Sequence, residues 1–337
     1  MNEVIEVSYT GDILAHRRCG RAWAYEKYVG FSPYEQVQAM EGRLVHHAME
    51  WLARRYREAG ELPTASELHD QLEHYFGVLW ARGVRTAFVS KADTLSRVQK
   101  NLFPSRKIDR VVKAVVTGAV HTEYELRSVR KVIQGDFGGK TKMLLTGVLD
   151  VVVQQQEPLT YQRSWEWTSI PQLVGRSVKS RVLARAEEVE IWDYKATRSS
   201  TSLCNDYVRQ LLTYAFLYRE RTGTLPVRCV LFFVNEESAA TRLLAIKMDE
   251  GIAQQAVDWT VAQAKELRKS ALLFEQKPTS VRGGALHLQD KPVGKRIDTE
   301  LKKQCTTCGF RFDCEEYRSH LGSANHPDIR LDNVNKN

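Results

Sequence analysis

The spacing of hydrophobic residues along the chain predicts a protein that combines helices and strands. Residues 36–57 place apolar side chains at helical spacing, which indicates an amphipathic helix. Residues 64–101 predict two further helices, the first beginning at a Thr64 or Ser66 cap. A long helix is expected from Asn205 to Gly223 and another across 251–274.

Strand patterns fill the rest of the hydrophobic sequence. Residues 143–153 form a nearly continuous apolar run, typical of a strand covered on both faces. The Val-, Thr- and Ile-rich residues 108–133 also predict strand, and an Arg- and aromatic-rich helical patch is expected at 16–23. Further strands are expected at 4–9, 190–195, 227–235 and 241–248. The fold class is therefore α/β, with a central mixed sheet flanked by helices.

Residues 157–186 are expected to interrupt the strands as a positively charged loop. Two tryptophans, Trp165 and Trp167, lie among its basic residues. Such a loop could hold single strands by charge and base stacking, or it could be an ordinary solvated insertion. The basic residues are Arg163, Arg176, Lys179, Arg181 and Arg185.

Composition narrows the class of protein. The 337 residues suffice for one large domain or two modest ones. Lys and Arg number 49 against 41 Asp and Glu, and the net charge of +8 suits a polyanionic partner without proving one. The chain lacks both a membrane-length apolar run and an N-terminal signal segment, so we expect a soluble cytoplasmic protein with no membrane partner.

Three polar residues in the strand patterns carry the first chemical signal. Asp193 and Lys195 are two residues apart on an expected strand, so their side chains project from the same face. A metal-dependent phosphodiesterase needs a carboxylate for a divalent cation and a fixed positive charge beside the phosphate. An acid and a lysine also alternate on many solvated strands. Asp150, inside an apolar run, needs either a salt bridge or a metal ion, because an unpaired buried charge is costly.

The cysteines carry the second signal. Six cysteines are too few for a disulfide scaffold in a chain of this length. Cys305, Cys308 and Cys314 have a spacing that can direct three thiolates at one soft metal or an iron–sulfur cluster. Zinc could take His320 or His326 as its fourth ligand, whereas a [4Fe–4S] cluster would want a thiolate, for which Cys19 is the candidate. The remaining cysteines, Cys204 and Cys229, are more simply structural.

The order of these motifs resembles the PD-(D/E)XK nuclease superfamily, in its RecB-like exonuclease branch. That branch includes CRISPR-associated iron–sulfur nucleases and the nuclease domains of helicase–nuclease complexes. The matching residues are Gly42 to His46, Gly147 to Asp150, Asp193 to Lys195, Gln210 to Tyr214, and the cysteines at 19, 305, 308 and 314.

The resemblance implies a restriction-endonuclease-like core and a role for each matching residue. His46, Asp150, Asp193 and the carbonyl of Tyr194 would ligate Mg²⁺ or Mn²⁺. Lys195 would orient or activate the attacking water and stabilise the charge that builds on the phosphate. Gln210 and Tyr214 would position the DNA or Lys195. The thiolates of Cys19, Cys305, Cys308 and Cys314 would hold a [4Fe–4S] cluster.

These observations together predict a metal-dependent DNA nuclease. We expect an exonuclease acting on single strands or ends, in DNA repair, CRISPR adaptation or phage defence, with a helicase or integrase as a candidate partner. The alternatives are an inactive nucleic-acid-binding subunit of a larger complex and a zinc-knuckle module joined to an unrelated α/β domain. The expected divisions are an N-terminal arm and helical region at 1–105, a nuclease core at 106–276, a linker and cluster segment at 277–320, and a disordered tail at 321–337.

Overall fold

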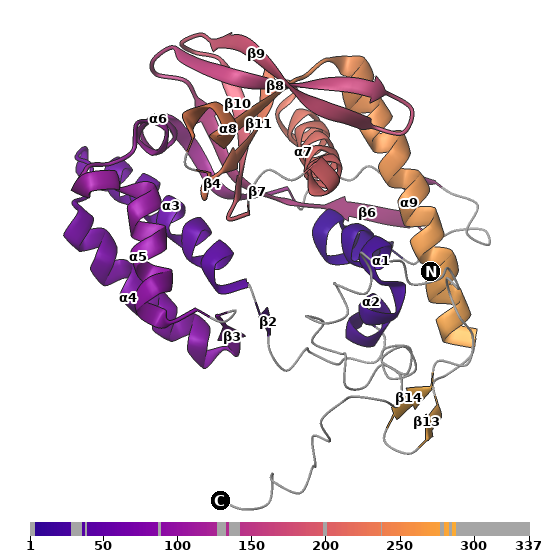
Figure 1. Ribbon diagram of the computed structural model, residues 1–337. Coiled ribbons are helices and arrows are strands. Elements are labelled where there is room, and N and C mark those ends of the chain that lie inside the picture. Colours follow the sequence, from indigo (N-terminus) through magenta and orange to yellow (C-terminus); the bar gives the residue numbers. More distant parts are fainter. Residues whose placement is uncertain are drawn as a thin grey trace, which may run out of the picture.

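The computed structural model describes residues 4–27, 36–37, 39–86, 89–126, 133–134, 142–197, 201–236, 238–276, 280–282 and 285–287. The predicted cysteine triplet, the expected tail, His320 and His326 lie outside these residues. The described chain is an α/β protein in which helices cover both faces of a central sheet (Figure 1). The division of the chain at 105, 276 and 320 remains a prediction from the sequence.

The central sheet has seven strands in the order β4-β7-β10-β11-β12-β8-β9, and it mixes parallel with antiparallel pairs. This arrangement confirms the predicted mixed sheet with flanking helices and is consistent with a restriction-endonuclease-like core. A smaller sheet pairs β1 with β6 and β5. In chain order, the strands are β1 Val4–Ser8, β2 Gln36–Val37, β3 Val84–Arg85, β4 Ala119–Glu125, β5 Ile133–Gln134, β6 Lys142–Thr146, β7 Val148–Gln154, β8 Leu159–Ser169, β9 Val174–Ala184, β10 Val189–Lys195, β11 Arg228–Phe233, β12 Leu243–Lys247, β13 Ser280–Arg282 and β14 Ala285–His287.

One face of the sheet is covered by a group of N-terminal helices, α3 to α6. The capping box of α4 forms at the predicted residue, because the Thr64 hydroxyl accepts from the Glu67 amide while the Glu67 carboxylate accepts from the Thr64 amide. The opposite face is covered by η1, α7 and α9. The helices are η1 Tyr9–Leu14, α1 Ala15–Arg18, α2 Gly20–Lys27, α3 Ala39–Ala59, α4 Ala65–Ala81, α5 Lys91–Leu102, η2 Pro104–Arg106, α6 Arg110–Gly118, α7 Thr201–Thr222, α8 Ala239–Arg242 and α9 Glu250–Gln276.

Two hydrophobic clusters, one on each face, hold these layers together. On β10, Ile191 packs into the cluster on the α7 side, whereas Trp192 and Tyr194 pack into the cluster on the α3 side. All residues of β11 are buried. Burial on both faces explains why the central strands have continuous apolar sequences.

The prediction of strand across 108–133 is wrong for its first part. Residues 110–118 form α6, whose N-terminus is capped by the Asp109 carboxylate accepting from the amides of Val111 and Val112. The buried residues Val112, Val115 and Val116 have helical spacing. The cap and this spacing outweigh the strand propensity of valine, and strand begins only at β4.

The prediction of a loop at 157–186 is also wrong. Most of this segment forms the hairpin β8–β9, which adds two long strands to one edge of the sheet. Trp165 is buried and therefore is not available for base stacking, whereas Arg176, Lys179 and Arg181 on the edge strand β9 are exposed. Basic side chains on an edge strand also discourage pairing with other chains.

The apolar run 143–153 is interrupted rather than continuous. Gly147 separates β6 from β7, and the two strands belong to different sheets. The Gly147 carbonyl accepts a hydrogen bond from the Leu126 amide, at the end of β4. This break ends the small sheet where the nuclease-like motif Gly147 to Asp150 begins.

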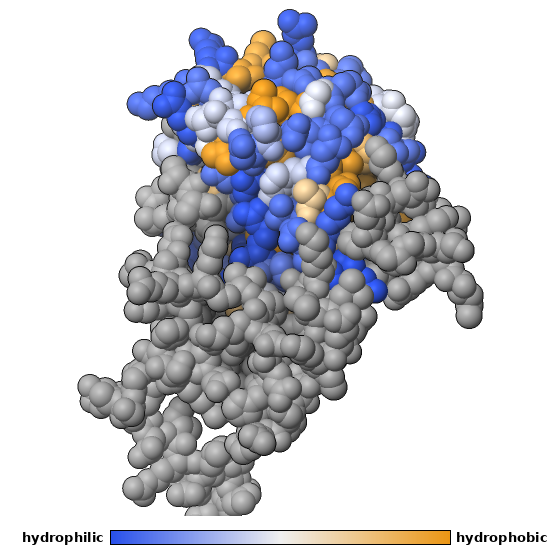
Figure 2. Space-filling view, turned by 90° about the vertical axis from the view of Figure 1, so that its right-hand side faces the viewer, coloured by the Kyte–Doolittle hydropathy of each residue, from blue (hydrophilic) through white to orange (hydrophobic). Residues whose placement is uncertain are grey.

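One face of the described chain is shown by hydropathy in Figure 2. On the face drawn in Figure 2, the coloured residues are mainly hydrophilic, and hydrophobic colour is confined to small separate areas. Among the described helices, none is both long and apolar enough to cross a bilayer.

Candidate active site

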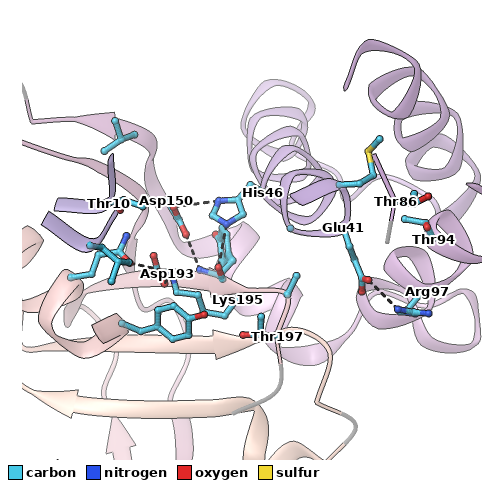
Figure 3. Close-up of a pocket in the computed structure, with 18 of the residues that line it drawn as sticks. Thr10, Glu41, His46, Thr86, Thr94, Arg97, Asp150, Asp193, Lys195 and Thr197 are labelled. Atoms are coloured by element: carbon cyan, nitrogen blue, oxygen red, sulfur yellow. Dashed lines mark hydrogen bonds and ion pairs between the residues drawn. The ribbon is translucent and has the colours of Figure 1, made fainter. Parts of the chain in front are cut away.

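The two predicted acidic residues lie next to each other on adjacent strands. β10 and β7 are antiparallel, with Trp192 opposite Val151. The next residues along the two strands, Asp193 and Asp150, therefore point to the same face of the sheet. Both carboxylates line one cavity, which meets the main geometric requirement of the sequence prediction (Figure 3).

Helix α3 brings His46 onto Asp150. The His46 ring nitrogens lie 3.4 Å from the Asp150 carboxylate and 3.2 Å from the Tyr194 carbonyl. Burial alone would lower the pKa of His46, but the charge of Asp150 and its hydrogen bond raise the pKa to about 9. Asp150 also accepts a hydrogen bond of 2.8 Å from the Tyr194 amide. Burial opposes ionisation of Asp150, but His46, Lys195 and this amide lower its pKa.

Lys195 is held in place from three sides. Its ammonium lies 2.6 Å from the Asp193 carboxylate, donates to the Gln210 side-chain oxygen at 3.3 Å, and lies 4.5 Å from the centre of the Tyr207 ring. Burial would lower the pKa of Lys195, but the negative charges of Asp193 and Asp150 raise it. Burial raises the pKa of Asp193 to about 6, with Lys195 opposing the rise and Asp150 adding to it. Lys195 is therefore a fixed positive charge.

Gln210 and Tyr214 on α7 extend this contact. The Gln210 amide donates to the Tyr214 hydroxyl at 3.2 Å, and that hydroxyl lies 3.4 Å from the Thr10 hydroxyl in the π-helical turn η1. Gly147 is required beside this tyrosine, because a Cβ atom there would lie 2.6 Å from the Tyr214 ring. Gln210 therefore contacts Lys195 directly and Tyr214 contacts Gln210, while the predicted roles of both residues stay predictions.

The cavity has a volume of about 670 Å³ and is lined by residues of strands β7 and β10 and of helices η1, α1, α3, α5 and α7. Its far wall carries Thr86, Thr94 and the Glu41–Arg97 ion pair of 3.1 Å (Figure 3). Arg18 also contributes to the lining. The cavity therefore combines carboxylates and Lys195 on the sheet with guanidinium groups on the helices.

This arrangement can be compared with known proteins. The profile of the PD-(D/E)XK nuclease superfamily matches residues 12–166 and 181–315, which is most of the chain. The chain belongs to the PD-(D/E)XK nuclease superfamily. No curated protein matches it.

Membership of the superfamily indicates a metal-dependent nuclease, which hydrolyses phosphodiesters. The match includes His46, Asp150, Asp193 and Lys195. It omits residues 167–180, which include the tip of the β8–β9 hairpin.

One acidic residue near the motif was missed by the sequence analysis. Ligand atoms of Glu123, His46 and Asp150 all lie within 4.8 Å of one another. The Glu123 side chain is exposed, but desolvation by neighbouring groups and then the charge of Asp150 raise its pKa to about 7. The sequence signal was the strand pattern at 121–126, which places Glu123 on a strand but does not reveal its neighbours.

The donor set of this PD-(D/E)XK site fits a divalent cation. Carboxylate and carbonyl oxygens suit Mg²⁺ and Mn²⁺, and the imidazole adds affinity for transition metals. His46 contacts both the Asp150 carboxylate and the Tyr194 carbonyl, and Asp193 lies on the same face of the sheet as Asp150. Asp193 is paired with Lys195 and lies outside the group of three potential ligands.

The predicted cluster ligand Cys19 lies between α1 and α2. Its backbone is extended there, with φ −158° and ψ 103°, and its half-buried thiol accepts a hydrogen bond from the Ala22 amide. The other three predicted thiolates are outside the described residues. Cys204 and Cys229 are buried, as their structural interpretation requires.

Proposed function

We propose that this chain is a deoxyribonuclease that uses Mg²⁺ or Mn²⁺ to hydrolyse phosphodiester bonds in single-stranded DNA or at DNA ends. The observation that carries the proposal is the position of Asp150, Asp193 and Lys195 in one cavity. A volume of about 670 Å³ is typical of a site for one small ligand, which favours a strand end over an intact duplex. The positively charged chain suits this substrate.

In the proposed reaction, a divalent cation would be held by His46, Asp150, Asp193 and the Tyr194 carbonyl. A divalent cation at this position would polarise the phosphoryl oxygen and lower the pKa of the attacking water. Lys195 provides an ammonium that is already oriented by Asp193 and Gln210, so it can stabilise the negative charge that develops on the phosphate. Arg18 and Arg97 offer guanidinium groups to neighbouring phosphates.

Metal removal tests the proposed activity. Protein purified without oxygen is incubated with end-labelled single-stranded and double-stranded DNA and with Mg²⁺ or Mn²⁺. We expect release of the label from single strands and ends, and complete loss of cleavage after chelation, because the cation activates the water. Cleavage that continues in excess chelator would contradict the proposal. A metal-bound protein that cleaves neither DNA nor RNA would instead be the non-catalytic nucleic-acid-binding subunit.

We further propose that the chain belongs to the RecB-like branch and that Cys19, Cys305, Cys308 and Cys314 hold a [4Fe–4S] cluster. The spacing of Cys305, Cys308 and Cys314, with Cys19 as a candidate fourth thiolate, supports this proposal. A cluster would join the N-terminal segment to the C-terminal one and restrict the unfolded chain. A helicase or integrase partner, and roles in repair, CRISPR adaptation or phage defence, are proposed on the same basis.

The iron content tests the cluster. We expect anaerobically purified protein to be brown and to contain about four irons per chain, because each [4Fe–4S] cluster holds that number. Cys308→Ser is expected to lose most of the iron, while Cys204→Ser, which changes a buried structural thiol, is expected to retain it. Colourless protein that contains zinc would contradict the cluster and favour the zinc knuckle.

A further inference from the structure

Three carboxylates form a row across three adjacent strands. β4 pairs with β7 so that Thr122 lies opposite Val151 and Tyr124 lies opposite Leu149. Glu123 therefore lies opposite Asp150, in the same row that continues to Asp193 on β10. Like charges that are opposite one another on a sheet repel, so a row of this kind needs nearby cations.

The basic side chains near this row balance the charge of some of its carboxylates but not of all three. Lys195 lies against Asp193 and His46 lies against Asp150, as Figure 3 shows. Within the described ranges, Glu123 has neither a hydrogen bond nor an ion pair, although its carboxylate lies within 4.8 Å of ligand atoms of His46 and Asp150. The end of the row on β4 therefore has an excess of negative charge next to an imidazole.

The backbone of β4 is irregular at this point. Glu123 has a φ of 46°, in the left-handed region, and the pairing of β4 with β7 shifts between Ala119 and His121. Such irregularities redirect side chains beside active sites. The left-handed backbone occurs at the glutamate that lies near His46 and Asp150, whereas the register shift lies earlier on the same strand. Together these three residues offer two carboxylates and one imidazole to a single cation.

We propose that Glu123 is a metal ligand of this nuclease and that it binds a divalent cation together with His46 and Asp150. This inference rests on the proposed metal-dependent function and extends its ligand set to a third strand. Glu123 would neutralise part of the cation's charge from the β4 side, while Asp193, which also pairs with Lys195, would do so from the β10 side. Glu123 then acts by binding the metal rather than by contacting the DNA.

Direct metal binding tests this inference without measuring activity. Mn²⁺ is titrated into the purified full chain, and binding is followed by calorimetry and by the loss of the paramagnetic resonance signal of free Mn²⁺. We expect Glu123→Gln to weaken Mn²⁺ binding about 10-fold or more, because it removes one charged oxygen ligand. Glu123→Asp, which keeps the charge on a shorter side chain, is expected to weaken it less. Glu125→Gln, the matched charge change on the same strand, should bind as the wild type does.

The control for the metal site is Asp150→Asn, which should lose Mn²⁺ at least as strongly as Glu123→Gln. If Asp150→Asn loses Mn²⁺ while Glu123→Gln binds it like the wild type, the role of Glu123 is overturned and the proposed function stands. If the wild-type chain itself does not bind Mn²⁺ or Mg²⁺, the proposed function fails. Equal weakening by Glu123→Gln and Glu125→Gln would indicate a general charge effect and would also overturn the inference.

Discussion

Lys195→Ala is expected to reduce the rate of DNA cleavage by about 10²- to 10³-fold, the loss that follows removal of one electrostatic group from a preorganised site. The Lys195 side chain is 14% exposed, its pKa is raised, and it is oriented by Asp193 and Gln210 towards the cavity. Water that replaces the ammonium cannot supply the same fixed charge. Single-turnover cleavage of labelled DNA at saturating Mn²⁺ measures the effect on the chemical step.

The matched control is Lys179→Ala, which removes an exposed lysine from the edge strand β9. This variant should cleave at close to the wild-type rate if the effect of Lys195 is local. Asp193→Ala is expected to be inactive as well, because it removes a carboxylate of the site and the partner of Lys195. Circular dichroism establishes that each variant is folded. Full activity in folded Lys195→Ala and Asp193→Ala would refute the catalytic site.

Glu190→Ala is expected to have the largest effect on stability, lowering the free energy of unfolding by about 3–5 kcal/mol. Glu190 is 0% exposed, and its carboxylate accepts from Gln155 at 2.6 Å, Tyr161 at 2.6 Å, Trp192 at 2.9 Å and Arg228 at 2.7 Å. Removing the carboxylate leaves the Arg228 charge buried with less compensation and leaves three neutral donors without their acceptor. Urea denaturation measures the loss.

Glu157→Ala is the control for this stability change. Glu157 is an exposed glutamate in the connection between β7 and β8, and its replacement should change the free energy of unfolding by less than about 0.5 kcal/mol. Glu190 lies at the opposite end of β10 from Lys195. A variant at Glu190 that unfolds at the same urea concentration as the wild type would show that the buried network does not stabilise the sheet.

Much of the site could be predicted from local sequence rules. The alternation of side chains along a strand placed Asp193 and Lys195 on one face, and helical spacing placed Gln210 one turn from Tyr214. These relationships depend only on the geometry of a single element. The structure adds that Gln210 contacts Lys195 and that Tyr207 lies beside it, because α7 packs on the same face as these side chains.

Glu123 shows where local rules fail. Its position depends on how β4 aligns with β7 and on a left-handed backbone at the residue itself. Neither follows from the alternating pattern at 121–126.

The hairpin β8–β9 was missed for a different reason. Its charged residues suggested a loop, although Leu159, Tyr161 and Trp165 alternate with other residues and are buried, the first two in the cluster on the α3 side and Trp165 in the cluster on the α7 side.

The sequence by itself determined the α/β class, the central strands, the capped helix α4, and the motif residues that identify a PD-(D/E)XK nuclease. These follow from hydrophobic periodicity, capping and short spacings, which act over a few neighbouring residues. Only the tertiary structure decided that His46 contacts Asp150, that Gly147 makes room for Tyr214, and that Glu123 joins the row of carboxylates. These contacts join residues that are far apart in the chain. They are fixed by strand register and by the packing of helices on the sheet. A side chain can contact such a distant partner only when the elements that carry both residues are in place.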